Sequence, residues 1–140
     1  MARSSVSANA EDLGKLLLRV VIGVLMLLHG FAKIKGGIDP IIGMATQHGL
    51  PVFVAFGVYV GEVIAPILLI IGLYTRAAAL LVAINMAFAV ALAHGNQLLS
   101  LTKQGGWALE LQGLFFFGAL AVMLLGAGRY SLGGAEGRAN

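Results

Sequence analysis

Apolar residues gather in four long stretches separated by short polar segments. The stretches cover about residues 16–34, 52–74, 77–99 and 107–127. An α-helix rises about 1.5 Å per residue, so about 20 residues cross the hydrocarbon core of a bilayer, which is about 30 Å thick. Each stretch reaches that length. The pattern predicts an all-α protein, a transmembrane up-down four-helix bundle that forms a single domain over residues 1–140.

A shorter element is predicted between the first two stretches. A glycine pair ends the first helix, Asp39 is expected to be an N-cap, and Pro40 is suited to the first helical position. Gly49, which precedes a Leu-Pro pair, is a stop signal. We therefore expect a short interfacial helix near residues 40–48 on the outer membrane surface.

Two helix faces carry residues that suit close packing. The first helix has one face with spacings of four and three, formed by Arg19, Gly23, Met26, Gly30 and Lys33. The third helix has a stripe of alanines at Ala83, Ala87 and Ala91. Small residues let helix backbones approach closely in lipid, so both faces are predicted helix contacts. Arg19 and Lys33 are expected to extend their charged groups toward opposite membrane surfaces.

Composition supports the membrane assignment and excludes several kinds of chemistry. Hydrophobic residues make up 59% of the chain and charged residues 11%, whereas soluble domains carry about 25% charged residues. The net charge of +3 is small and scattered, which argues against a nucleic-acid partner. The chain has no cysteine, which excludes thiol catalysis and cysteine-bound metal or iron–sulfur sites on this chain.

The basic residues predict an orientation. In an up-down bundle both termini lie on one side, together with Arg3, Lys15, Arg19, Arg76, Arg129 and Arg138. The other side carries Lys33, Lys35 and Lys103. The positive-inside rule then predicts that both termini are cytoplasmic, in a bacterial plasma (inner) membrane. No small-residue cleavage site follows the first apolar stretch, so it is expected to be a retained helix rather than a signal peptide.

Ionisable residues within the apolar stretches are the candidates for function. Helical rise places one such group of each helix in the outer half of the bundle: His29, Glu62, His94 and Glu110. A lone charge in mid-membrane costs about 3 kcal/mol, so these groups are expected to face one another or a wet cavity. Pro66 cannot donate to the carbonyl group of Glu62, which predicts a kink there.

Each of these residues also has a purely structural interpretation. The two carboxyl groups can hydrogen-bond helices together, and the two histidines can reach lipid headgroups. Trp107 is typical of an interfacial anchor, and Asn85 is interpreted as a residue that holds helices together.

At these positions the chain resembles the DoxX family of small four-helix membrane proteins, over about residues 13–133. The resemblance rests on Arg19-x3-Gly23-x5-His29-Gly30-x2-Lys33, Glu62-x3-Pro66, Gly72-Leu73-Tyr74-Thr75-Arg76, Glu110 and Gly126-Ala127-Gly128-Arg129-Tyr130-Ser131-Leu132. It implies a membrane oxidoreductase or a subunit of a redox system. A related family, DoxD, belongs to a thiosulfate:quinone oxidoreductase.

The first functional hypothesis is a component of a quinone-linked membrane oxidoreductase. Its predicted catalytic residues are the same four titratable groups: Glu62, Glu110, His29 and His94. Its predicted cofactor-binding residues are His29, Lys33 and Trp107, and the apolar side chains of residues 115–117 suit an isoprenoid tail. The chain has no dinucleotide fingerprint, so a nicotinamide or flavin domain would be another polypeptide.

Two other hypotheses remain open. His29 and His94 could ligate haem, or the histidines and carboxylates a metal, although no Glu-x-x-His motif supports a metal site. Alternatively, the protein is a non-enzymatic membrane subunit or a small-solute carrier whose polar residues hold the helices together. Beyond the lipid bilayer, the expected partners are further copies of the chain or a redox subunit.

Overall fold

The computed structural model describes residues 5–137 and 139–140, and its regular elements are helical. In chain order they are α1 (Ser5–Gly36), α2 (Asp39–Gln47), α3 (Val52–Ala55), α4 (Gly57–Tyr59), the π-helix η1 (Val60–Ile64), α5 (Ala65–Ile71), α6 (Thr75–Ala93), the 3-10 helix η2 (Gly95–Gln97) and α7 (Glu110–Leu125). The all-α prediction is confirmed.

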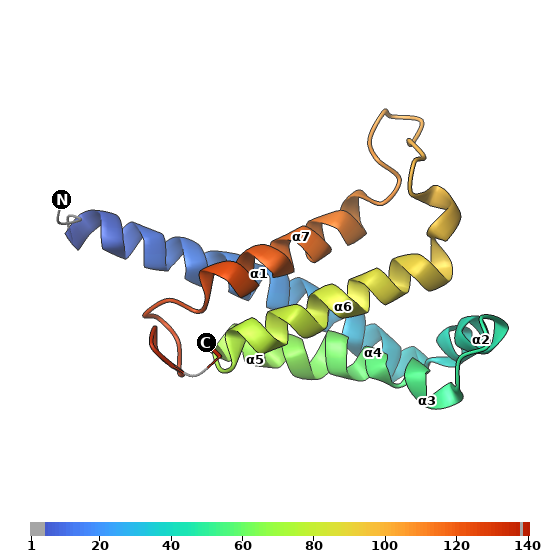
Figure 1. Cartoon of the computed structure of the whole chain (residues 1–140), viewed down its shortest axis with the longest axis horizontal. Helices are drawn as coiled ribbons and strands as arrows, with labels where there is room; N and C mark the ends of the chain where they lie inside the picture. The colour runs from blue at the N-terminus through green and yellow to red at the C-terminus, as the bar shows by residue number, and fades with distance from the viewer. Residues whose placement is uncertain (1–4, 138) are drawn as a thin grey trace.

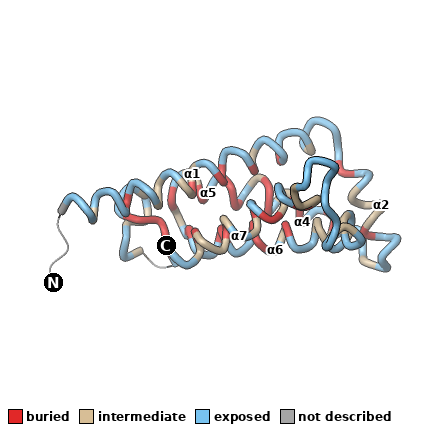
Figure 2. The backbone as a smooth tube through the Cα atoms, turned by 90° about the horizontal axis from the view of Figure 1, so that it is seen from above, coloured by how far each residue is buried: buried red, intermediate tan, exposed pale blue. Residues whose placement is uncertain are grey.

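Four rods run along the long axis of the molecule (Figure 1). They are α1, the continuous α3–α5 segment, α6 and α7. The α5 segment packs against α1 and α6, and α7 packs against α6 and α1, so the four rods close around one interior. Figure 2 shows the buried backbone positions along this interior. We call the end where α1 begins the tail end, and the opposite end, where α2 lies, the α2 end.

Three of the rods are long and apolar enough to cross a membrane. They comprise Val6–Gly36, Val52–Ile71 and Thr75–Ala93. The fourth, α7, has 16 residues, which corresponds to about 24 Å and is shorter than a hydrocarbon core. It was predicted over residues 107–127, but Trp107 forms an isolated antiparallel bridge with Leu101, and Gly126, at φ 76°, ends the helix.

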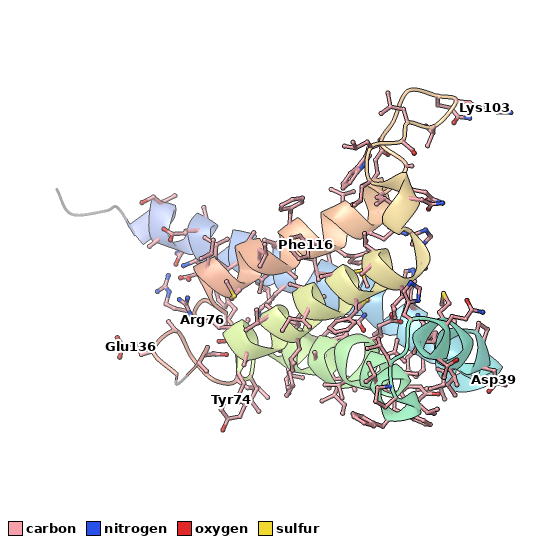
Figure 3. The ribbon with its side chains drawn as sticks, turned by 45° about the vertical axis from the view of Figure 1, so that its right-hand side comes forward. Asp39, Tyr74, Arg76, Lys103, Phe116 and Glu136 are labelled. Atoms are coloured by element: carbon pink, nitrogen blue, oxygen red, sulfur yellow. The ribbon has the colours of Figure 1, made fainter. Side chains whose placement is uncertain are left out.

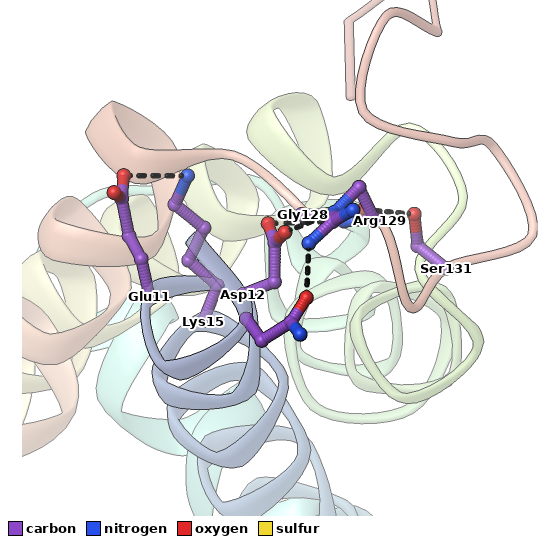
Figure 4. Close-up of polar contacts among 7 residues, drawn as sticks. Glu11, Asp12, Lys15, Gly128, Arg129 and Ser131 are labelled. Carbon is purple, nitrogen blue, oxygen red and sulfur yellow. Dashed lines mark hydrogen bonds and ion pairs between the residues drawn. The ribbon is translucent and has the colours of Figure 1, made fainter. Parts of the chain in front are cut away.

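Helix α1 begins well before the predicted residue 16, because the polar segment ahead of it is also helical. Lys15 pairs with Glu11 one turn earlier, at 3.2 Å. Asp12 binds the side chain of Arg129 from the segment after α7, at 2.5 Å (Figure 4). This hydrogen bond raises the pKa of the Arg129 guanidinium. Local pairing and a tertiary contact therefore extend the helix beyond its apolar part.

The interior of the bundle is built from all four rods. Its buried residues are Ile22, Met26, Ala65, Leu69, Ala78, Ala79, Val82, Ala83, Met86, Phe115, Ala119 and Val122. The predicted packing face of α1 is confirmed, since a Cβ at Gly23 would lie 3.0 Å from the carbonyl oxygen of Pro66. The predicted alanine face of α6 is correct only in part: Ala83 is buried in the interior, but Ala87 and Ala91 are exposed. The interior face of α6 instead continues through Ala78 and Val82.

Arg19 does not extend to the membrane surface, which corrects the expectation from sequence. It is 1% exposed, and its guanidinium donates to the carbonyl oxygens of Leu69 and Ile70 at 2.6 and 2.7 Å and to those of Ala127 and Tyr130. The last carbonyl groups of a helix have no intrahelical donor and carry partial negative charge. The end of α5 therefore supplies the partners that make burial of this cation tolerable.

The tail end holds most of the basic residues described. Arg76 donates to Met123 O and Leu124 O at the end of α7, at 2.9 and 3.1 Å. Figure 3 shows Arg76 and Glu136 at this end, and Asp39 and Lys103 at the opposite end. Two arginines used in the orientation argument, Arg3 and Arg138, lie outside the described residues.

The predicted short helix is confirmed as α2. It begins at Asp39, so Asp39 is the first helical residue and not the N-cap; Ile38 holds the N-cap position without a side-chain bond. The prediction was wrong by one residue because the chain already turns at Gly37, whose φ is 79°. Gly49, at φ 73°, follows the helix as expected. Ala45 anchors α2 in a small buried cluster at this end.

Candidate functional site

A polar cluster of three residues joins three helices near the α2 end. Lys33 on α1 forms an ion pair with Oε2 of Glu62 on η1, and Asn85 on α6 donates to Oε1 of Glu62 at 3.2 Å. The side chain of Glu62 is 5% exposed and that of Lys33 is 26% exposed. An ionised carboxylate accepts hydrogen bonds at both oxygens, and here each oxygen receives a donor. The polar cluster thus has a nearly buried carboxylate at its centre.

The π-turn of η1 places this carboxylate. The backbone N–H of Ala65 donates to the carbonyl group of Val60, five residues earlier, which is the π-helical pattern. Such turns are rare and occur frequently at functional sites. Pro66 follows directly and has no N–H to continue the α-helical ladder. At the position of the predicted kink, a π-turn interrupts the α-helical pattern and changes which side chains face α1 and α6.

Two glycines allow the helices to approach closely around Glu62. A Cβ atom at Gly30 on α1 would overlap the carbonyl oxygen of Glu62, and a Cβ atom at Gly61 would overlap the side chain of Asn85. Both positions are buried. Glycine is therefore required on both sides of η1 for the polar cluster to close.

A cavity of about 460 Å³ lies beside the polar cluster. It lies between the α3–η1 segment and α6, with α2 at one end. Its polar lining consists of Lys33, Glu62, Asn85 and His94, and the other lining side chains are apolar apart from glycine. Its lining on α6 runs from Leu81 to Ala93, so the cavity extends for about 18 Å along that helix. The cavity has the shape and chemistry of a site for an elongated, mostly apolar molecule.

His94 presents a polar atom that lacks a protein partner. It is the C-cap residue of α6, at φ −135°, and lines the cavity. Within the part of the chain that the structure describes, its Nδ1 is buried and makes no hydrogen bond. Buried polar atoms are nearly always paired, so this nitrogen is expected to bind a ligand or water, as a donor or an acceptor according to the tautomer.

The structure does not bring the other predicted site residues to this cavity. The His29 side chain is exposed, with Nδ1 2.9 Å from Leu25 O and the ring 5.6 Å from that of Phe115. Glu110 is the first residue of α7 and accepts a hydrogen bond from the backbone N–H of Trp107 at 3.0 Å. The expectation that all four titratable groups face one cavity is corrected accordingly. Glu110 instead satisfies a backbone donor next to the helix start, where such donors lack partners.

Trp107 also lies elsewhere. Its Nε1 donates to Leu98 O at 2.8 Å, and its ring lines a second, separate cavity of about 360 Å³ between α6 and α7. Phe116 and Phe117 line that second cavity too, so they do not form a wall beside Glu62.

The prediction that Asn85 holds helices together is confirmed by its bond to Glu62, which joins α6 to η1, but its place in the cavity lining was not predicted. The available signal was an amide within 19 residues of apolar helix, where a polar side chain needs a partner. Among the described residues, no group of three or more His, Cys, Asp or Glu side chains could hold a metal ion. The polar groups that line the cavity, an amine, a carboxylate, an amide and an imidazole, can hydrogen-bond an organic ligand.

Comparison with known proteins identifies the family. The profile of the DoxX family matches residues 14–95. An "Uncharacterized protein" of Haemophilus influenzae is 34% identical over 104 residues, which cover 71% of this chain and 76% of that protein. The "Putative oxidoreductase CatD" of Bacillus subtilis is 34% identical over 79 residues, which cover 56% of this chain and 58% of that protein. No solved structure matches the chain. With the family profile covering more than half of its length, the chain belongs to the DoxX family of membrane proteins.

Proposed function

We propose that this DoxX family protein is a component of a quinone-linked membrane oxidoreductase, and that the cavity beside Glu62 takes the quinone. The observation that carries the proposal is the cavity itself, in which apolar walls meet the polar cluster and the imidazole of His94, whose buried Nδ1 has no partner among the described residues. The name of the Bacillus relative, an oxidoreductase, supports the reaction class.

The proposal includes a membrane arrangement. The four rods cross a bacterial inner membrane in up-down order, with the tail end in the cytoplasm, so the cavity lies in the outer half. Among the described residues the tail end carries four basic residues and the α2 end three, and this excess agrees with the positive-inside rule. The four are Lys15, Arg19, Arg76 and Arg129, and the three are Lys33, Lys35 and Lys103. The short α7 requires local thinning of the bilayer or a contribution from the loop before it.

The cavity residues fit a quinone headgroup. A quinone is an apolar ring with two carbonyl acceptors, and when bound it supplies two-electron chemistry coupled to proton uptake. The imidazole of His94, which lines the cavity, can donate to one carbonyl group through a ring N–H. Lys33 and Asn85 hold Glu62 at the cavity wall, where its carboxylate can exchange protons with the site.

A second function has one specific observation in its favour. Both oxygens of Glu62 are already bound, by donors from α1 and α6. In a non-enzymatic subunit, the polar cluster would serve only to hold three helices together. In that case the cavity would have no affinity for a quinone.

The test is a quinone titration of the detergent-purified protein, with ubiquinone-2 as the probe. The variant His94→Ala removes the proposed donor, and loss of one hydrogen bond of about 1.4 kcal/mol weakens binding about tenfold. Glu62→Gln tests the carboxylate. His29→Ala is the matched control, because His29 is a histidine on the same bundle outside the cavity. Saturable binding that is weakened by His94→Ala and retained by His29→Ala supports the proposal. No binding to the folded wild-type protein would favour the non-enzymatic subunit.

A further inference from the structure

The walls of the cavity differ in exposure. At its α2 end the lining includes the buried Ala45 of α2 and Ala55 of α3, at 0% and 3% exposure, and the partly buried Ile41 and Met44 of α2. On its flank, the lining residues Val60 and Ile84 are 38% and 45% exposed. The exposed large apolar side chains of the lining therefore lie on its flank and not beneath α2.

The exposed flank follows one face of α6. Leu81, Ile84 and Phe88 are spaced by three and four residues, line the cavity and are exposed. Val60, at the start of η1, faces them across the opening. From Leu81 to Phe88 the opening extends for about 10 Å along the helix. We call these four residues the portal.

The portal lies within the segments that are apolar and long enough to cross a membrane. In a bilayer its four exposed side chains face acyl chains and not water, because no water is available there. The polar cluster lies deeper than this opening, since Glu62 is buried and Asn85 is half-buried, whereas Val60 and Ile84 are exposed. A molecule that enters through the portal from the lipid meets the hydrogen-bonding groups first and the apolar walls beneath α2 beyond them.

We infer that the portal is a subsite for the hydrocarbon tail of a membrane-dissolved quinone. The isoprenoid or alkyl tail leaves the cavity through the portal toward the lipid. This inference rests on the proposed function and specifies its substrate class: a lipid-soluble quinone that enters laterally, with α2 closing the aqueous side. It also replaces the aromatic residues 115–117 of α7 as the tail site, since Phe116 and Phe117 line a separate cavity.

The test distinguishes the contribution of the quinone headgroup to binding from that of its hydrocarbon tail. A tryptophan at the portal, in Ile84→Trp, narrows the opening without adding a charge or removing a hydrogen-bonding group. Ile67→Trp is the matched control, because Ile67 is equally exposed, at 44%, on α5 and does not line the cavity. Binding of ubiquinone-2, which has a tail, and ubiquinone-0, which has none, is measured by equilibrium dialysis. Thermal unfolding of each variant checks that it is folded.

We expect Ile84→Trp to weaken ubiquinone-2 about tenfold, as steric overpacking does, and to leave ubiquinone-0 within about twofold. Ile67→Trp is expected to change neither. Val60→Trp, from the opposite side of the portal, replaces Ile84→Trp if that variant does not fold. Equal effects on the two quinones, or no effect, would overturn the lateral portal while leaving the quinone site intact. Failure of both quinones to bind the wild-type protein would overturn the proposed function, and the portal with it.

Discussion

Replacing Lys33 with methionine removes the cation from the polar cluster while keeping a side chain of similar length. The variant leaves the Glu62 carboxylate, which is 5% exposed, with Asn85 as its remaining donor among the contacts described above. Loss of the counter-charge is therefore expected to destabilise the fold rather than only the site.

The size of the effect follows from the burial of the two partners. Exposed ion pairs contribute about 0–1 kcal/mol, and breaking a fully buried pair costs about 3–5 kcal/mol. Glu62 belongs to the buried class, but the side chain of Lys33 is 26% exposed. We therefore expect Lys33→Met to lower the free energy of unfolding by about 2–3 kcal/mol. The double variant Lys33→Met/Glu62→Gln carries no unpaired charge, so it is expected to recover about 2 kcal/mol relative to the sum of the two single changes.

The assay is reversible unfolding in mixed detergent micelles, followed by far-UV circular dichroism. Lys35→Met is the control, since Lys35 is an exposed lysine on the same last turn of α1. Two results would show that the ion pair does not hold α1 to η1. Either Lys33→Met lowers the free energy of unfolding no more than Lys35→Met does, or the effects of the changes at Lys33 and Glu62 are additive.

Three further changes test the packing around the site. Gly30→Ala places a methyl group against the carbonyl group of Glu62 and is expected to lower the free energy of unfolding by about 1–3 kcal/mol. Its control, Gly14→Ala, has open space at its Cβ and should be neutral or stabilising by up to about 1 kcal/mol. Equal effects of the two changes on thermal unfolding would contradict the close approach of α1 to η1. Arg19→Met leaves carbonyl groups at the end of α5 without donors and is expected to cost about 2 kcal/mol, and an unchanged unfolding midpoint would refute its anchoring role. Glu110→Ala should cost about 1 kcal/mol through the loss of its bond at the start of α7 and leave quinone affinity unchanged; a large loss of affinity would return Glu110 to the site.

Most of the helices could be predicted from the sequence. Apolar stretches long enough to cross a bilayer, and glycine residues that end helices, are local signals. The packing face of α1 was also predictable, since the spacing of Gly23 and Gly30 and its consequence for backbone approach are properties of one helix. The short helix α2 followed from its flanking glycines and Pro40, although its first residue was misplaced by one position.

Which residues form the site could be predicted only in part, because it depends on how each helix is rotated about its own axis relative to its neighbours. Depth along the bundle can be estimated from helical rise, so Glu62, Lys33 and His94 were correctly placed near one end. Rotation cannot be estimated in this way, and the π-turn of η1 changes it further. For that reason His29 and Glu110, at suitable depth, lie outside the cavity, while Asn85 lies within it.

Arg19 was correctly placed on the contact face of α1, but the groups that bind its guanidinium were unpredictable for a related reason. A guanidinium near a helix end is ordinarily expected to reach the membrane surface. Its partners here are carbonyl groups at the end of α5 and in the segment after α7, which are far from it in sequence and carry no side-chain signature. Backbone groups that become available only through tertiary packing leave no trace in the residue types.

The most direct test of the central claim, that the cavity beside Glu62 binds a quinone, is photolabelling with an azido-substituted ubiquinone followed by peptide mapping. The account predicts labels within residues 54–62 and 81–94, which include the cavity lining from α3 to η1 and from α6, and it predicts that excess ubiquinone-2 prevents them. Labels on residues 115–117 of α7 with none in those two segments, or labelling that excess ubiquinone-2 leaves unchanged, would contradict it.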